Sequence, residues 1–418
     1  MKRVLMVTYH CPPALNAESI LVWKTLRLLP DWHDVTVLTA DDGGARDEQL
    51  GMPTAVRVKR YRTPRPAGAF TGRVADKLLG FAADERLLWA LSGLRGDVSH
   101  GAYDVLYSRS HPGASHIFAW LIKRRLGLPW VAQFSDPWAS NPYHSGHTKV
   151  RAQVDRYFER EVIRHADRLI FPTHEIQAMY ERQYPGWRVA ERAVILPHHL
   201  APELYHAGSA GSTPDIADTA DTVIRGAGGG TTGLRDGAGD GLALCYFGDF
   251  YGLRSPEPLI RAVQRLCADD PAAVGRLRLR FVGNIQPKFL PLLDQSPVPV
   301  ATGRVSYLES LRTMAQSSVL VLLDAPNETG VNPFLPSKLI DYLGAMRPVL
   351  GMTETRGTAA DILRRFGHPV IRPQDIDGIR RQIAQWLEQP PQPPQRAAEE
   401  FYSAQVVGQL ASILEDMG

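Results

Sequence analysis

The chain has 418 residues, more than one hydrophobic core usually serves, which predicts two or three domains. With 44% hydrophobic and 22% charged residues, it has the composition of a globular protein. The formal net charge of +3 is too small to indicate a nucleic-acid partner. The three cysteines form no CxxC pair, so we expect neither a disulfide framework nor a zinc knuckle.

Membrane and targeting signals are weak. No uncharged apolar run approaches the roughly 20 residues of a membrane span. The opening stretch MKRVLMVTYH lacks the cleavage site of a signal peptide. We therefore expect a cytoplasmic protein. Two segments that mix apolar and basic residues, 80–96 and 120–127, either contact the inner face of a membrane peripherally or form core helices with a solvated face.

In chain order, the first half alternates strand-like and helix-like segments. The continuous apolar run at 3–9 predicts a strand buried on both faces, and further strands are expected at 33–40, 103–110, 129–136 and 166–173. Apolar residues at helical spacing predict helices at 20–29, 115–127 and 151–166. This alternation predicts a parallel, doubly wound α/β sheet.

The amino-acid composition changes between residues 206 and 240, which are rich in Gly, Ala, Thr and Asp and nearly free of large apolar residues. Such a segment buries too little surface to order itself, so we interpret it as a flexible insertion or linker. Its glycines neither follow a strand nor open a helix, as a phosphate-binding loop requires.

A second α/β block follows. Its expected strands are 242–250, 277–285 and 318–325, and its expected helices are 257–268, 307–316 and 337–346. A proline-rich break at 388–396 precedes a last amphipathic segment. The predicted organisation is a domain of residues 1–205, the linker 206–240, a domain of residues 241–390, and a C-terminal helix within 391–418 that crosses back to the first domain.

The most informative stretch is NPFLPSKLIDYLGAMRPVL, residues 332–350. Pro336 and Ser337 fit the start of a helix, where Ser337 is expected to cap free N–H groups. Lys338 and Asp341 are three residues apart and share a helix face. Because a helix N-terminus attracts phosphate, Lys338 would add charge there, and Asp341 would accept hydrogen bonds from a ribose. The alternative is an i,i+3 ion pair on the surface of a core helix.

This stretch resembles the donor site of the retaining GT-B glycosyltransferases of family 4. The resemblance covers both α/β blocks in order and leaves out residues 206–240. Many members carry two glutamates eight positions apart, where this sequence has Pro333 and Asp341. The contact that the first glutamate makes to the sugar is then expected from backbone or from Asn332, or is missing.

A second motif of the same resemblance is YFGDFYGLRSPEPLIRA, residues 246–262. In the family a basic residue of this loop grips the donor diphosphate, and Arg254 stands at that position. A guanidinium can bind phosphate oxygens bidentately. The family often has two basic residues here, so Lys338 is expected to share the role. The alternative is a solvent-exposed loop arginine.

The remaining donor-site residues are also implied by the resemblance. They follow strands or precede helices of the second block. The expected donor-binding set is Gly248, Asp249, Gly283, Asn284, Arg304, Val305, Asn332, Phe334, Leu335, Ser337 and Asp341. The sequence has no Asp-x-Asp motif, and the adjacent His198 and His199 would point different ways. We therefore expect no metal and no other cofactor.

Loops of the first block are expected on the acceptor side. In TYHCPPALNAES, residues 8–19, Pro12 and Pro13 match the family, but Asn16 and Ala17 replace two glycines. Single histidines in such loops are often structural. The acceptor-side candidates are His10, Asn16, Glu18 and His111, with His116 as a further one.

The stretch VAQFSDPWASNPY, residues 131–143, is a strand that ends in Ser135 and Asp136. It resembles the Arg-Asp-x-Trp variants of the family, with Ser135 in place of the arginine. Asp136 is expected to deprotonate or orient the acceptor hydroxyl; the alternative is that it caps a helix.

Together these features predict an α/β protein of GT-B fold, with two Rossmann-like, doubly wound parallel-sheet domains facing each other across a cleft. The resemblance implies a retaining, metal-independent glycosyltransferase that moves a sugar from a nucleotide-diphosphate sugar to an acceptor hydroxyl, in bacterial polysaccharide, glycolipid or natural-product biosynthesis. The expected catalytic residues are Arg254, Lys338 and Asp136. The alternatives are another GT-B enzyme, such as a nucleotide-sugar epimerase, and a non-catalytic scaffold.

Overall fold

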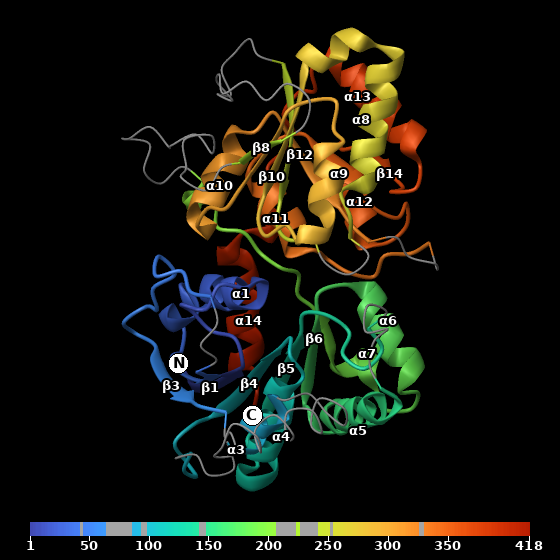
Figure 1. Ribbon diagram of the computed structural model, residues 1–418. Helices are drawn as coiled ribbons and strands as arrows, with labels where there is room; N and C mark the ends of the chain where they lie inside the picture. Colours follow the sequence, from blue (N-terminus) through green and yellow to red (C-terminus); the bar gives the residue numbers. More distant parts are fainter. Residues whose placement is uncertain are drawn as a thin grey trace, which may run out of the picture. The chain divides into compact units, whose positions relative to one another are not determined.

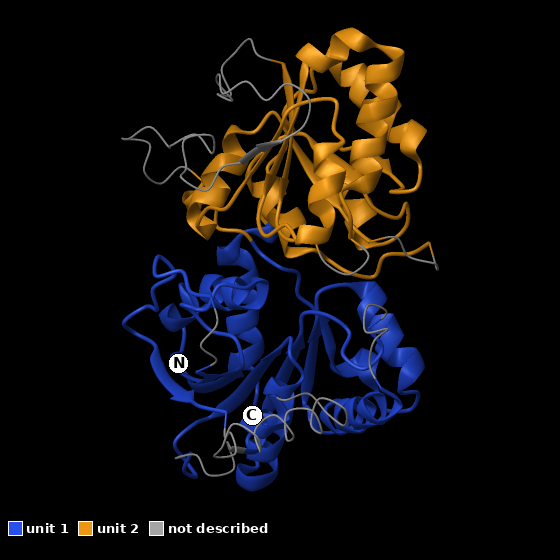
Figure 2. Ribbon diagram, viewed as in Figure 1, with its two compact units in different colours: residues 1–199, 400–418 blue, residues 200–399 orange. Residues whose placement is uncertain are grey.

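The computed structural model describes residues 1–41, 45–63, 86–92, 98–141, 148–205, 223–225, 241–250, 254–325 and 330–418. These residues divide into two compact units (Figure 2). Unit 1 comprises Met1–His199 and Glu400–Gly418, and unit 2 comprises Leu200–Glu399.

Unit 1 is built on a parallel sheet. Within the residues described for it, seven strands lie in the order β3-β2-β1-β4-β5-β6-β7 (Figure 1). Their bounds are Arg3–Thr8 for β1, Asp34–Ala40 for β2, Arg57–Tyr61 for β3, Val105–Ser110 for β4, Trp130–Phe134 for β5, Arg168–Phe171 for β6 and Ala193–Ile195 for β7. All neighbouring strands run parallel. Strands β4 and β5 are buried along their whole length, as strands of a parallel sheet covered on both faces usually are.

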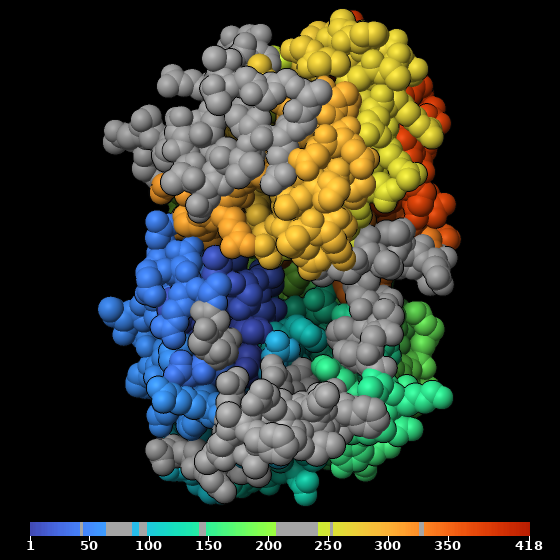
Figure 3. Space-filling view, in the orientation of Figure 1, coloured from blue at the N-terminus to red at the C-terminus, as the bar shows by residue number. Residues whose placement is uncertain are grey.

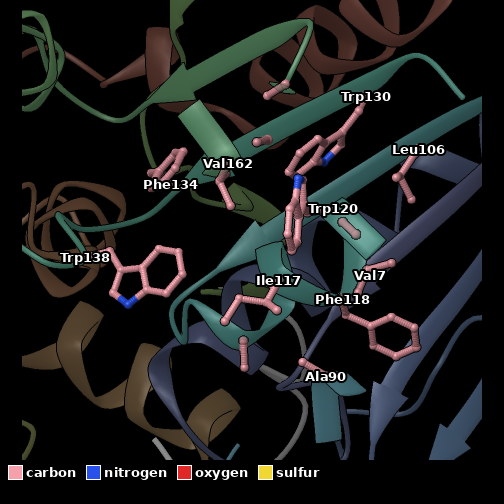
Figure 4. Packing of buried hydrophobic residues seen from close by; sticks show 14 of the residues in the cluster. Val7, Ala90, Leu106, Ile117, Phe118, Trp120, Trp130, Phe134, Trp138 and Val162 are labelled. Carbon is pink, nitrogen blue, oxygen red and sulfur yellow. The ribbon is translucent and has the colours of Figure 1, made fainter. Parts of the chain in front are cut away.

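Helices cover both faces of this sheet. Their bounds are Ala17–Leu26 for α1, Arg86–Ser92 for α3, Ala114–Leu126 for α4, Lys149–His165 for α5, His174–Gln183 for α6, Val189–Arg192 for α7 and Ser403–Glu415 for α14. Successive side chains of a strand point to opposite faces. Leu5 and Val7 therefore pack with α4, where Figure 4 shows Phe118 and Trp120, whereas Val4 packs on the face that α1 and α14 cover.

Helix α14 completes the core of unit 1, although it follows the whole of unit 2 in the chain. Its buried side chains Val407, Leu410 and Leu414 pack against residues of β1, β2 and α1. The buried ring of His33 hydrogen-bonds the carbonyl oxygen of Ala411 at 3.0 Å. The last helix is thus part of the first hydrophobic core.

Unit 2 has a sheet of the same kind. Its described strands lie in the order β14-β13-β12-β9-β10-β11-β8. Their bounds are Val223–Arg225 for β8, Leu242–Phe247 for β9, Leu277–Val282 for β10, Val300–Gly303 for β11, Val319–Leu323 for β12, Val349–Met352 for β13 and Val370–Ile371 for β14. Strand β8 pairs antiparallel with β11, and the other neighbours are parallel. After β8, the chain continues at β9, moves outward to β11, and then returns to the other side of β9 at β12, so the strand order reverses there.

Helices flank this sheet as well. Their bounds are Glu257–Asp269 for α8, Leu290–Asp294 for α9, Tyr307–Gln316 for α10, Ser337–Gly344 for α11, Thr358–Arg365 for α12 and Ile376–Glu388 for α13. Helices α8 and α13 pack into the core through Leu259, Ile260, Ile379 and Ile383. The polar face of α8, yellow in Figure 3, belongs to the surface of unit 2.

The predicted linker 206–240 contains β8. Residues 206–222 and 226–240 lie outside the described residues, so its flexibility stays a prediction. The described parts of the two apolar and basic segments are helical, and Trp89, Trp120 and Ile122 are buried in the core of unit 1. Among the described residues, none of the helices combines the length and the hydropathy that crossing a bilayer requires.

We predict that Leu414→Ala lowers the free energy of unfolding by about 2–5 kcal/mol, because it leaves a cavity at a fully buried position of α14. Gln409→Ala, on the exposed side of the same helix, should change it by less than about 0.5 kcal/mol. Denaturant unfolding measures both. Equal effects of the two variants would show that α14 adds nothing to the core of unit 1.

Candidate active site

The carboxyl edge of the unit 2 sheet gathers most of the predicted donor-site residues. Gly248 follows β9, Gly283 follows β10 and Asp324 follows β12. The strand order reverses between β9 and β12, and in open α/β sheets such a point is where ligands bind. The register that pairs Val319 with Leu244 places Asp324 alongside the residue after Gly248.

Two glycines allow the close packing at the carboxyl edge of the unit 2 sheet. Gly248 has φ +123°, and a Cβ there would lie 2.0 Å from Nζ of Lys338. Gly283 has φ +146°, and a Cβ there would lie 2.4 Å from the carbonyl oxygen of Gly248. Any side chain at either position would clash, and the backbone angles also favour glycine. The absence of side chains therefore lets the Lys338 amine come close to the end of β9.

The amine of Lys338 has a poorly hydrated environment. It lies 3.3 Å from the hydroxyl of Tyr246 and 4.8 Å from the centre of the Tyr246 ring. Burial lowers the pKa of Lys338 to about 7, and the positive charge of Arg254 adds to this effect. The carboxylates of Asp324, Asp249 and Asp341 act in the opposite direction. Near neutral pH the amine is thus poised to gain a proton when an anion binds.

Arg254 approaches the same edge from the loop after β9. Its Nη2 lies 3.4 Å from Oδ1 of Asp324, whose side chain is 3% exposed. The other oxygen of Asp324 accepts a hydrogen bond of 2.9 Å from Nδ2 of Asn332. The guanidinium side chain is itself only 15% exposed. The alternative of a solvent-exposed loop arginine is therefore wrong, because a buried carboxylate holds it.

Helix α11 begins beside these cations. Pro336 is its N-cap, and no side chain of the described residues caps the helix. The expectation that Ser337 caps the helix is wrong, because Ser337 is already the first helical residue and lies past the capping position. The segment that leads into the helix is held by Asn332, whose Oδ1 accepts a hydrogen bond of 3.0 Å from N–H of Phe334.

Asp341 is not part of a surface ion pair, because its side chain is 6% exposed. Its Oδ1 accepts a hydrogen bond of 3.2 Å from the hydroxyl of Tyr307, and its carbonyl oxygen accepts one of 2.9 Å from Tyr205. Tyr205 packs on Gly344, where a Cβ would meet its ring at 2.4–2.7 Å. The two tyrosines hold the first turns of α11 in place.

The other predicted donor residues are spread along the same edge. Oδ1 of the exposed Asp249 accepts a hydrogen bond of 2.7 Å from N–H of Asn284, whose side-chain oxygen accepts one from Arg304. Val305 is half-buried. Phe334 and Leu335 are buried, so their side chains belong to the core. The described geometry therefore brings Arg254, Lys338 and the start of α11 together, and places Asn284 and Arg304 at the neighbouring strand end.

Sequence reasoning missed Asp324, which appeared only as the end of an apolar strand. It also missed Gly357, which has φ +112° and where a Cβ would lie 2.0 Å from the carbonyl oxygen of Asn332. A lone aspartate after a buried strand was the one available signal for Asp324, because residues at strand ends face ligands in such sheets.

The predicted acceptor residues of unit 1 have mainly structural partners. Asn16 caps α1 by accepting a hydrogen bond of 2.9 Å from N–H of Ser19, and its amide lies 3.2 Å from Nδ1 of His10. Its φ of −156° is extended, so this position needs no glycine. Glu18 forms an ion pair of 2.6 Å with Arg109, and both side chains are at most 9% exposed.

Asp136 follows β5 at the carboxyl edge of the unit 1 sheet and is half-buried. Thr148, not Asp136, caps α5, the next described helix. The segment after Asp136 is anchored by the buried Glu159, whose Oε2 accepts a hydrogen bond of 2.7 Å from N–H of Ala139. Trp138 packs on Gly113, where a Cβ would lie 2.1 Å from its indole ring. This contact ties the loop of Asp136 to the loop that contains His111.

Three further histidines, His116, His198 and His199, lie in the core. His116 is fully buried, and burial together with the charge of His111 lowers its pKa to about 3. His198 and His199 are also buried, and Nδ1 of His199 lies 2.8 Å from Oγ of Ser403. In the described part of the chain, no group of three His, Cys, Asp or Glu residues is placed to hold a metal ion.

Comparison with known proteins shows which proteins this chain resembles. Residues 22–198 match the family model described as glycosyl transferase 4-like domain. This part of unit 1 is therefore similar to glycosyl transferase 4-like domains. The resemblance to family 4 predicted from the sequence is confirmed.

Two curated relatives extend the match beyond this domain. The D-inositol 3-phosphate glycosyltransferase of Stackebrandtia nassauensis is 25% identical over 294 residues, 68% of this chain and 59% of that protein. The protein of the same name from Actinosynnema mirum is 28% identical over 306 residues, 68% of this chain and 63% of that protein. The matched region thus spans about six tenths of the length of these relatives.

A solved structure agrees in fold. The sucrose-phosphate synthase of Thermosynechococcus elongatus superimposes with a TM-score of 0.66 at 14% identity, and the match covers 99% of this chain and 98% of that one. The two Rossmann-like units together with this similarity confirm the predicted GT-B fold.

We predict that Lys338→Met stabilises unit 2 at pH 7. The pKa of Lys338 is lowered from 10.5 to about 7, so between these values the unfolded chain binds more protons than the folded one. The Lys338 contribution to stability therefore rises with pH across this window, and methionine removes both the slope and the cost of desolvation. Thermal unfolding from pH 6 to pH 10 measures this.

Lys288→Met, at an exposed lysine of unit 2, is the matched control and should follow the pH profile of the unsubstituted protein. A Lys338→Met protein that is less stable at pH 7, with an unchanged pH profile, would contradict the low pKa of this amine.

Proposed function

We propose that the chain is a retaining, metal-independent glycosyltransferase that moves a hexose-type sugar from a nucleotide-diphosphate sugar to an acceptor hydroxyl. The observation that carries the proposal is the pairing of two poorly hydrated cations, Arg254 and Lys338, at the reversal of strand order in unit 2, beside the uncapped start of α11. The names of the curated relatives, D-inositol 3-phosphate glycosyltransferases, support glycosyl transfer to a hydroxyl.

The chemistry requires positive charge where the diphosphate leaves. As the bond to the sugar breaks, negative charge collects on the diphosphate and the sugar becomes oxocarbenium-like. The guanidinium of Arg254, the ammonium of Lys338 and N–H groups at the start of α11 would stabilise that charge. Because these groups are partly shielded from water, each counts for more than it would in bulk solvent.

The other residues take supporting roles in the proposal. Asp341, held by Tyr307, would accept hydrogen bonds from the nucleotide ribose. Asp136 of unit 1 would orient the acceptor hydroxyl. Retention at the anomeric carbon is proposed by attack from the side of the leaving group, with the hydroxyl proton passing to the phosphate. This route needs no protein nucleophile.

A thermal-shift screen against nucleosides, nucleoside diphosphates and their sugars tests the proposal first. A true donor and its diphosphate product should both raise the melting temperature, since ligands that bind only the folded state stabilise it. Incubation of the donor with and without candidate acceptors then separates transfer from epimerisation. A protein that binds no nucleotide in this screen is a scaffold, and the proposal fails.

Arg254→Ala and Lys338→Ala should each lower turnover by about tenfold or more, equivalent to about 1.4 kcal/mol of lost transition-state stabilisation. Steady-state kinetics on the identified donor measures the change. Arg261→Ala, in an exposed ion pair with Glu257 on α8, and Lys288→Ala are the controls and should retain full turnover. Full activity in both Arg254→Ala and Lys338→Ala would reject the assigned roles.

Asp341→Ala should weaken the binding of the free nucleoside diphosphate, because it removes the proposed acceptor for the ribose hydroxyl groups. Titration calorimetry compares the ribonucleotide with its 2′-deoxy analogue. The loss should be larger for the ribonucleotide. An unchanged affinity for both would count against the ribose role.

A further inference from the structure

Asp324 is a buried carboxylate that neither the sequence motifs nor the proposed chemistry uses. Its side chain is 3% exposed, at the carboxyl end of β12. A carboxylate in such a place is costly unless cations and hydrogen-bond donors surround it. We therefore ask which cations and hydrogen-bond donors this buried carboxylate stabilises in return.

The contacts of Asp324 join three parts of unit 2. Oδ1 lies 3.4 Å from Nη2 of Arg254, which comes from the loop after β9. Oδ2 accepts a hydrogen bond of 2.9 Å from Nδ2 of Asn332, in the segment that leads into α11. The amide of Asn332 also reaches Oγ1 of Thr353, after β13, at 3.3 Å. One carboxylate thus links the two segments that carry the proposed diphosphate-binding groups.

Asp324 also acts on the second cation. Strands β9 and β12 are neighbours in the sheet, so Asp324 lies near Gly248, against which the Lys338 amine packs. The charged groups that act on this amine are Arg254, which disfavours its protonation, and Asp324, Asp249 and Asp341, which favour it. The hydroxyl of Tyr246 is its neutral neighbour. Of the three carboxylates, Asp324 is the most buried, so its charge is the least screened.

We propose that Asp324 is a positioning residue of the donor site: it is the internal counter-ion that anchors Arg254 and favours the protonated form of Lys338, the form that attracts a diphosphate. The inference rests on the proposed function, because it concerns the same diphosphate site. Asp324 itself does not touch the substrate in this account, since its two oxygens face Arg254 and Asn332.

The test is the pH dependence of nucleoside-diphosphate affinity, measured by titration calorimetry from pH 5.5 to pH 9 with the diphosphate found in the screen. Of the two forms of the Lys338 amine, only the protonated one adds its charge to the attraction of the ligand, so affinity falls as the pH rises through the titration of Lys338. In Asp324→Asn the amine loses a proton more readily. The affinity of the Asp324→Asn variant for the diphosphate should begin to fall at least half a pH unit lower than that of the unsubstituted protein. This shift corresponds to a change of about threefold in the protonation equilibrium of Lys338.

Two further variants separate this role from a general structural one. Asp269→Asn, which removes an exposed carboxylate paired with Arg380 in unit 2, should leave the pH profile unchanged. In the Lys338→Met background, Asp324→Asn should produce no shift, because the group that titrates is gone. A shift of the same size in that background would overturn the proposal, as would an unshifted profile for Asp324→Asn alone.

Where Asp324→Asn alone does not fold, the comparison is between Arg254→Ala and the Arg254→Ala/Asp324→Asn double variant, which removes both charges of the buried pair together. The double variant should lose affinity at the lower pH, and identical profiles would overturn the proposal. Failure of the proposed function has a different signature, because the unsubstituted protein would then bind no nucleoside diphosphate at any pH.

Discussion

The amine of Lys338 rests against Gly248, at the end of the central strand of the second sheet, and much of the surrounding structure follows from the need to accommodate it. A side chain at Gly248 would overlap the amine, and a side chain at Gly283 would overlap Gly248. Tyr246 presents its ring and hydroxyl to the amine from the same strand. The end of β9 is therefore shaped around a cation, although a cation is expensive to remove from water.

The free-energy cost of burying the Lys338 amine is hard to explain by a contribution to folding. Two cations near each other disfavour each other's charge, and here Arg254 and burial together lower the pKa of Lys338 to about 7. Asp324 offsets part of the repulsion, and Asn332 completes the hydrogen bonding of its carboxylate. Arrangements of this kind, with strained electrostatics at the edge of a sheet, are typical of sites that bind or transform an anion. A diphosphate would relieve the repulsion by supplying the missing negative charge.

Much of the fold was predictable, because alternating apolar runs and helical periodicities depend on short-range patterns. The strands around Val4, Leu106, Leu244 and Leu320 are buried as their continuous apolar sequences indicate. The roles of Arg254 and Lys338 as neighbours were predictable only through the resemblance to family 4. Asp324 was not, because its partners Arg254 and Asn332 come from different loops and meet only when the sheet forms. Glu18 shows the opposite case, a residue expected to bind the acceptor that has a structural partner instead. That partner, Arg109, lies on a strand far away in the sequence, so the ion pair could not be predicted.

The central claim, that these two cations receive a diphosphate, is tested most directly by counting protons. Titration calorimetry of a nucleoside diphosphate at pH 8, in buffers of different ionisation enthalpy, gives the number of protons taken up on binding. The account predicts an uptake that approaches one proton per ligand, assignable to Lys338 by its loss in Lys338→Met, and no uptake for the nucleoside. Binding of the diphosphate without proton uptake at any pH between 7 and 9, or binding no tighter than that of the nucleoside, would contradict it.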